Sequence, residues 1–171
     1  MQFSPERTKQ VLSILALATF VAMIGNGIIN PLITLYSQGF GASGIYLGVI
    51  FSSFAIARSV VTPIIGKISD KHDRKRFMLI GMAAYALFSL FYLLPSNIFG
   101  LIVVRLLHGA ASGFIAPVVM AYASEIAPPD KKASSLGFLT AARFFGFGLG
   151  PIIGGFVETY YGFQAAFVCM A

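Results

Sequence analysis

The sequence predicts an all-α, polytopic membrane protein, and two observations support that prediction. Hydrophobic residues make up 57% of the 171 positions and charged residues only 11%, which leaves too little polar surface to cover the core of a soluble domain. The second observation is that residues 10–57 contain no charged side chain, and neither do residues 77–104. Apolar stretches of this length are typical of helices that cross a lipid bilayer.

Apolar runs divide the chain into five complete spans and the beginning of a sixth. A membrane-spanning helix needs roughly 20 mainly apolar residues. A further run at residues 163–171 is too short to cross, so we expect the chain to be a fragment that stops inside a helix. The runs that are long enough cover about residues 11–36, 45–66, 77–95, 98–124 and 133–157.

Basic residues gather on one side of the predicted spans. Nine of the twelve lie before the first span, in the loop at residues 66–76 or just before the fifth span, whereas the alternate loops contain no Lys or Arg. Because basic loops stay in the cytoplasm, we expect a cytoplasmic N-terminus and an integral protein of the cell inner or plasma membrane. This distribution also accounts for the net charge of +6 without nucleic acid as a partner.

Residues suited to catalysis or metal binding are scarce. Cys169 is the only cysteine, so it can form neither an internal disulfide nor a metal site by itself. The glycines at 146, 148 and 150 match part of a nucleotide-binding loop, but they lie inside an apolar span with no strand before it. No nucleophile–base pair or metal cluster is evident, so we expect no enzyme, no cofactor and no metal.

Two segments of the sequence recur at nearly the same offset. Residues 29–36 (INPLITLY) are echoed by residues 115–122 (IAPVVMAY), 86 positions later, and residues 62–66 (TPIIG) by residues 150–154 (GPIIG), 88 positions later. The offset corresponds to three helices, and an odd number makes the second copy enter the membrane from the opposite side. Such inverted repeats are typical of secondary transporters. Chance similarity between apolar helices is the alternative.

Three motifs, in order along the chain, resemble those of one family. Residues 66–75 (GKISDKHDRK) resemble Gly-x-Leu-Ala-Asp-Arg-x-Gly-Arg-Arg, residues 105–109 (RLLHG) resemble Arg-x-x-Gln-Gly, and residues 146–155 (GFGLGPIIGG) fit Gly-x-x-x-Gly-Pro-x-x-Gly-Gly. These are similar to motifs of the major facilitator superfamily, in its drug/proton antiporter-like branch. The chain departs from them at Asp73, where the family has glycine, and at His108, where it has glutamine.

The resemblance implies the N-terminal six-helix bundle of a twelve-helix major facilitator fold, built from inverted three-helix repeats. It also implies a secondary active transporter that exports small molecules, in exchange for protons, by alternating access. Its partners would be a small-molecule substrate, protons, the lipid bilayer and the missing C-terminal bundle. Two alternatives remain open: an importer or exchanger of organic anions on the same fold, and a non-transporting membrane receptor or scaffold.

The loop at residues 66–76 is expected to form a conformational latch. Gly66 would let the second helix approach a neighbour closely, and Asp70 can accept hydrogen bonds from a helix N-terminus. Arg74 could pair with Glu125 at the end of the fourth helix, and the resemblance implies that these contacts hold the outward-facing state. The alternative is that the loop charges only orient the protein in the membrane.

The fifth helix carries a stripe without side chains, because glycines recur there every four residues. Such a stripe lets two backbones touch, and a proline inside it removes a helical hydrogen bond and favours a bend. We expect a tightly packed, bendable helix that controls leakage through the cavity; ordinary close packing is the alternative. The motif consists of Gly146, Gly150, Pro151, Gly154 and Gly155.

Several polar residues lie within the predicted spans, where a charge costs about 2.5–3.5 kcal/mol on insertion scales. We expect them to line the substrate or proton pathway, although snorkelling or structural pairing is the alternative, above all for Arg58. No Asp or Glu lies within the body of a span, so His108 is the candidate proton carrier, and the arginines favour an anionic or zwitterionic substrate. The set comprises Asn26, Asn30, Arg58, Arg105, His108 and Arg143.

Overall fold

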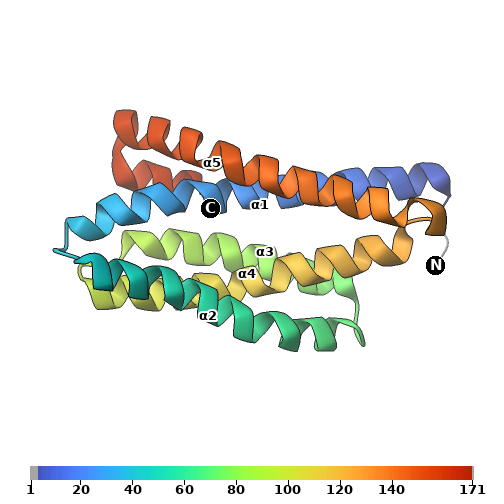
Figure 1. Ribbon diagram of the computed structural model, residues 1–171, viewed down its shortest axis with the longest axis horizontal. Coiled ribbons are helices and arrows are strands. Elements are labelled where there is room, and N and C mark those ends of the chain that lie inside the picture. The colour runs from blue at the N-terminus through green and yellow to red at the C-terminus, as the bar shows by residue number, and fades with distance from the viewer. Residues whose placement is uncertain (1–3, 171) are drawn as a thin grey trace.

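The computed structural model describes residues 4–170, which form a bundle of long helices without a strand (Figure 1). Successive helices run in alternating directions along the long axis of the bundle (Figure 1). Within residues 4–170, five helices are long and apolar enough to cross a membrane. The elements are α1 (Pro5–Gln38), α2 (Gly44–Ser69), α3 (Arg74–Leu90), η1 (Phe91–Leu93), α4 (Ile98–Ile126), η2 (Pro129–Lys131) and α5 (Lys132–Cys169).

Side-chain caps fix where three of the helices begin. Ser4 accepts a hydrogen bond from the backbone of Arg7 at the start of α1, and Asn97 accepts one from Gly100 at the start of α4. Asp73 caps α3 in the same way. A capping oxygen satisfies a backbone N–H that has no partner within the helix. Asp73, one of the two residues that depart from the family motifs, thus caps the start of the third helix.

Helices α1 and α4 form the centre of the bundle. Half of the most apolar segment of each is buried, against 17% for α2 and α5 and 22% for α3. Helix α1 packs along α5, and α4 packs along both α2 and α3 (Figure 1). Under the repeat inferred from the sequence, α1 corresponds to α4 and α5 to α2, so the contact between α1 and α5 has its equivalent between α4 and α2. The architecture thus agrees with an inverted repeat.

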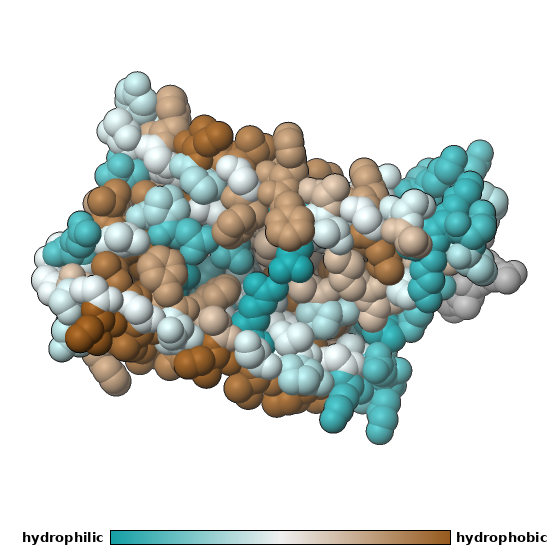
Figure 2. Space-filling view, in the orientation of Figure 1, coloured by the Kyte–Doolittle hydropathy of each residue, from teal (hydrophilic) through white to brown (hydrophobic). Residues whose placement is uncertain are grey.

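Apolar side chains form two buried clusters and also cover much of the outer surface. One cluster contains Ile29 and Ile33 of α1 with Leu101 of α4, and the other contains Leu15 of α1 with Ile115 of α4. Large apolar side chains remain exposed on α2, α3 and α5, and Figure 2 shows brown residues over much of the visible face. Exposed apolar surface of this kind suits contact with lipid or with another helical bundle.

The charged loops lie together at one end of the bundle, which we call the basic end and which comprises Arg7, Lys9, residues 67–76, Lys131 and Lys132. Figure 2 shows hydrophilic residues gathered at this end, where the α2–α3 and α4–α5 connections lie in Figure 1. The opposite end holds the α1–α2 and η1–α4 connections, which carry no Lys or Arg.

The chain reverses direction at Gly162, inside the helix α5. This residue has φ 80° and ψ 174°, a backbone conformation outside the helical region and almost restricted to glycine. Figure 1 shows the last part of the chain folding back from this point beside α1. We expected the sequence after residue 157 to form a loop, but the helix continues to residue 161. Residues 163–169 begin a further helical segment after the turn.

Candidate functional site

The predicted latch residues meet at the basic end. The Nε and Nη2 atoms of Arg74 donate to Oε1 of Glu125 at 3.0 and 2.6 Å, and Nη2 also donates to Oδ1 of Asp70 at 2.9 Å. Arg74 is only 12% exposed, whereas the two carboxylates are 62% and 56% exposed. One guanidinium therefore ties together the end of α2, the start of α3 and the end of α4.

Gly66 does not make the close approach that we expected. A Cβ atom placed on Gly66 would meet no other atom within 4 Å among the described residues. The described bundle therefore offers no neighbour that requires a glycine at this position, and the expected role of Gly66 stays a prediction.

The glycine stripe of α5 packs against the backbone of α1. A Cβ on Gly146 would collide with the carbonyl oxygen of Phe20, a Cβ on Gly150 would collide with Gly27, and a Cβ on Gly154 would lie 3.1 Å from the Cα of Ile28. These contacts support close packing as one role of the motif.

Two other members of the motif behave differently from the stripe. Gly155 faces open space within the described residues, and Pro151 is exposed, although its ring borders Gly27. The sequence analysis missed Gly27 itself. The repeat contained the signal, because the offset of 86 relates Gly27 to Gly113 of α4, which packs against Val61 of α2.

Two of the six predicted pathway residues lie in a sealed cluster rather than in a cavity. Arg105 is 1% exposed and His108 is 0% exposed. The guanidinium of Arg105 lies over the rings of Phe51 and Phe54, with Cζ at 5.2 and 5.4 Å from the ring centroids. Its Nε and Nη2 atoms have no hydrogen-bond partner among the described residues. Cation–π contact with these two rings thus contributes to holding Arg105 in place.

Hydroxyl groups of α3 and η1 surround the ring of His108. Its Nδ1 lies 3.2 Å from the Tyr92 hydroxyl and its Nε2 lies 3.4 Å from the Ser89 hydroxyl. The ring of Tyr85 packs beside it, with centroids 4.1 Å apart. The sequence analysis missed these three partners. Their spacing of four and three residues places them on one helix face, which is the signal that would have identified them.

Three other predicted pathway residues line one cavity. Asn26 of α1, Arg58 of α2 and Arg143 of α5 surround a space of about 160 Å³, whose apolar walls are Met23, Phe144 and Phe147. Figure 2 shows hydrophilic side chains about midway along the bundle, between apolar regions. Asn30 is not among the lining residues; its Nδ2 donates to the backbone carbonyl of Asn26 at 3.0 Å.

Neither cavity arginine has a counter-charge in the described part of the chain. No hydrogen bond or ion pair joins Arg58 or Arg143 to another described residue, and the two positive charges repel each other. The cavity can therefore supply two guanidinium groups and an amide to a bound molecule.

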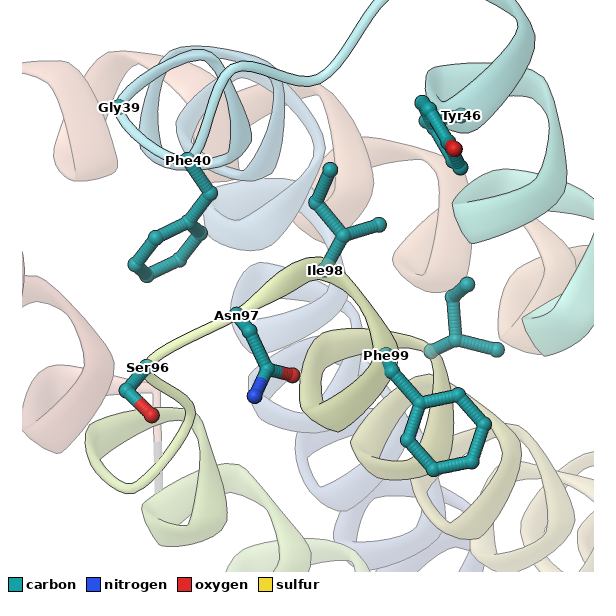
Figure 3. Close-up of a pocket in the computed structure, with 8 residues that line it drawn as sticks. Gly39, Phe40, Tyr46, Ser96, Asn97, Ile98 and Phe99 are labelled. Atoms are coloured by element: carbon teal, nitrogen blue, oxygen red, sulfur yellow. The ribbon is translucent and has the colours of Figure 1, made fainter.

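A larger pocket lies at the end opposite to the basic end (Figure 3). It has a volume of about 570 Å³ and no charged side chain in its lining. Figure 3 shows Phe40 and Phe99 beside the turn that holds Asn97, with Tyr46 across from them on α2. The polar side chains of this pocket are uncharged, and one of them, Asn97, already caps α4. The arginine cavity is therefore the better candidate site. Among the described residues, no group of three metal-ligating side chains is found.

Comparisons with known proteins agree with this architecture. The sequence matches the family model of the Major Facilitator Superfamily over residues 15–171. It is 36% identical over 151 residues to MJ1560 of Methanocaldococcus jannaschii, named as an uncharacterized MFS-type transporter, covering 88% of this chain and 39% of that protein.

Two further relatives carry names that refer to resistance. Multidrug resistance protein 2 of Bacillus subtilis is 30% identical over 160 residues, covering 94% of this chain and 40% of the relative. The quinolone resistance protein NorA of Staphylococcus aureus is 29% identical over 138 residues, covering 81% and 36%. The chain thus spans about two fifths of the length of the curated relatives it matches. The resemblance inferred from three motifs is confirmed, and with it the expectation of an integral membrane protein that is not an enzyme. The chain belongs to the Major Facilitator Superfamily of transporters.

Proposed function

We propose that the chain is the N-terminal bundle of a secondary active transporter that exports small molecules in exchange for protons. The observation that supports this proposal best is the cavity lined by Asn26, Arg58 and Arg143. Charged groups within membrane spans are costly and commonly mark a solute path. The names of the relatives from Bacillus subtilis and Staphylococcus aureus add support for export.

The mechanism we propose is alternating access, in which two bundles rock about a central site. The second bundle would pack against the apolar surface of this one. The contacts of Arg74 with Asp70 and Glu125 would hold the ends of α2, α3 and α4 in the arrangement of one of the two states. The N-terminus and the basic end would face the cytoplasm, in the plasma membrane of the cell.

The proton site of the proposed exchange lies either at His108 or in the second bundle. His108 remains a candidate, because the described spans contain no carboxylate within their bodies. However, the ring is completely buried and both of its nitrogens face hydroxyl groups. We therefore propose that any protonation of His108 requires a movement of α3 relative to α4 that admits water. Otherwise the proton site belongs to the second bundle.

Transport by the natural full-length polypeptide in proteoliposomes tests this proposal. Norfloxacin, a fluorescent quinolone, would be supplied outside vesicles with an acidic interior, and the pH of the lumen would be followed with trapped pyranine. An antiporter accumulates norfloxacin while the lumen becomes more alkaline, and a protonophore abolishes the accumulation. Protein-free liposomes are the control.

Other results of the same assay would select an alternative. Accumulation of organic anions without any proton movement would indicate the importer or exchanger of organic anions instead. A protein that is correctly folded but moves no probe in either direction would indicate a receptor or scaffold.

A further inference from the structure

We infer that the cavity between Arg58 and Arg143 is a subsite for an organic anion, specifically a carboxylate carried on a flat apolar ring. The inference rests on the proposed transport function, because the subsite would then select the substrate. It assigns recognition to one cavity rather than to all the arginines within the spans.

The charge of the cavity is the first argument. Two guanidinium groups from different helices line it, and the lining contains no carboxylate. Three of the six acidic residues, Asp70, Asp73 and Glu125, are paired at the basic end. The others lie in the first turn of α1, in η2 and near the end of α5. A bound carboxylate would supply the missing negative charge, and a planar guanidinium matches a carboxylate with two hydrogen bonds.

The composition of the walls is the second argument. Asn26 is buried and adds an amide, which can donate to a carboxylate oxygen. Phe144 and Phe147 supply aromatic faces, and Met23 supplies a flexible apolar surface. The volume of about 160 Å³ is below the roughly 300–1,000 Å³ of pockets that enclose a whole drug-sized ligand. The cavity therefore suits an acid group and its adjoining ring.

The third argument is the contrast with Arg105. Its guanidinium also has no counter-charge among the described residues, but it is enclosed by Phe51 and Phe54 and almost completely buried. Arg105 is not among the residues that line the cavity of Arg58 and Arg143. Burial within the bundle thus accounts for Arg105, whereas Arg58 and Arg143 are partly exposed at the cavity wall. Only this pair is placed to meet a ligand.

A set of three ligands of nearly equal shape tests the inference on the unchanged protein. Binding of radiolabelled benzoate to the full-length polypeptide in detergent at pH 7.5 is measured by scintillation proximity, with competition by benzamide and benzamidine. These ligands carry a negative charge, no charge and a positive charge. We expect benzamide to compete at least tenfold more weakly than benzoate, and benzamidine not to compete.

Two substitutions and a matched control locate the site. Arg58→Gln and Arg143→Gln should each weaken benzoate binding at least tenfold, because each removes one charged donor. Lys71→Gln removes the same charge from the basic end and should leave binding unchanged. Gel filtration and thermal unfolding show whether each variant is folded. Where a variant is not, the three-ligand comparison still decides the inference.

Two results would overturn the inference: equal competition by benzoate and benzamide, or unchanged benzoate binding in both arginine variants. Proton flux driven by norfloxacin separates this failure from failure of the proposed function. Charge-blind binding together with intact proton flux removes only the anion subsite. Charge-selective binding without flux of any probe retains the subsite and removes the transport proposal.

Discussion

Replacing Gly150 with alanine should force α1 and α5 apart. The added Cβ would lie 2.6 Å from the carbonyl oxygen of Ile24, whereas ordinary contact begins at 3.4 Å. The obstacle is backbone on both sides, because the Cβ would also meet Gly27, so no side-chain rotation relieves the overlap. The helices must separate by about 1 Å, and a gap of that size forfeits up to half of the dispersion attraction between the atoms it parts. We expect a loss of about 1–3 kcal/mol in the free energy of unfolding.

The matched control for this substitution is Gly155→Ala. It lies on the same helix and in the same motif, but a Cβ there meets nothing within 4 Å. Because alanine favours a helix over glycine by roughly 0.5–1 kcal/mol, Gly155→Ala should be neutral or stabilising. Unfolding of the full-length polypeptide by sodium dodecyl sulfate, followed by circular dichroism, gives both values. Equal stability of the two variants would refute the packing argument.

Three further predictions concern other contacts of the bundle. Glu125→Gln should change the free energy of unfolding by no more than about 1 kcal/mol, because the carboxylate is more than half exposed, yet it should slow norfloxacin transport several-fold. Exchanging the charges of Arg74 and Glu125 should restore transport. Unchanged transport in the Glu125→Gln variant would contradict the latch. Tyr92→Phe should destabilise the fold by about 1 kcal/mol, because it removes the hydrogen bond to the buried His108. Tyr85→Phe removes a hydroxyl without a partner among the described residues and should cost less in the same unfolding assay. The reverse order of the two costs would contradict the hydrogen bond between Tyr92 and His108. Gly162→Ala should cost about 1–3 kcal/mol, because the backbone conformation at this turn is nearly restricted to glycine; an unchanged unfolding midpoint would show that the turn relaxes.

The sequence predicted where the helices lie along the chain better than it predicted which face of each helix points into the bundle. Hydropathy alone located the long apolar helices of the described part of the chain, and the family agrees with an integral membrane protein. Opposite charges suggested the pair formed by Arg74 and Glu125. Both signals are local or depend only on charge. The end of α5 was misplaced, because the exposed polar stretch after residue 157 lacks the apolar run that marks a span but remains helical until Gly162.

The grouping of the polar residues could not be predicted, because it depends on how each helix is rotated within the bundle. Hydropathy does not distinguish Arg105 from Arg143, since each is a lone arginine in an apolar helix. The structure turns Arg105 toward the rings of Phe51 and Phe54 and turns Arg143 toward the cavity. Hydropathy carries no information on that rotation when apolar residues surround the whole helix.

The close backbone approach of Gly27 and Gly150 couples the movement of α1 to that of α5. With no side chain between them to change rotamer, neither helix can slide along the other without collision, so the two must travel together. Arg143 belongs to α5 and moves with this helix pair, whereas Arg58 belongs to α2, which packs along α4. Any displacement of one helix pair relative to the other therefore alters the distance between the two guanidinium groups. The affinity for the proposed anion would then depend on the conformation of the bundle.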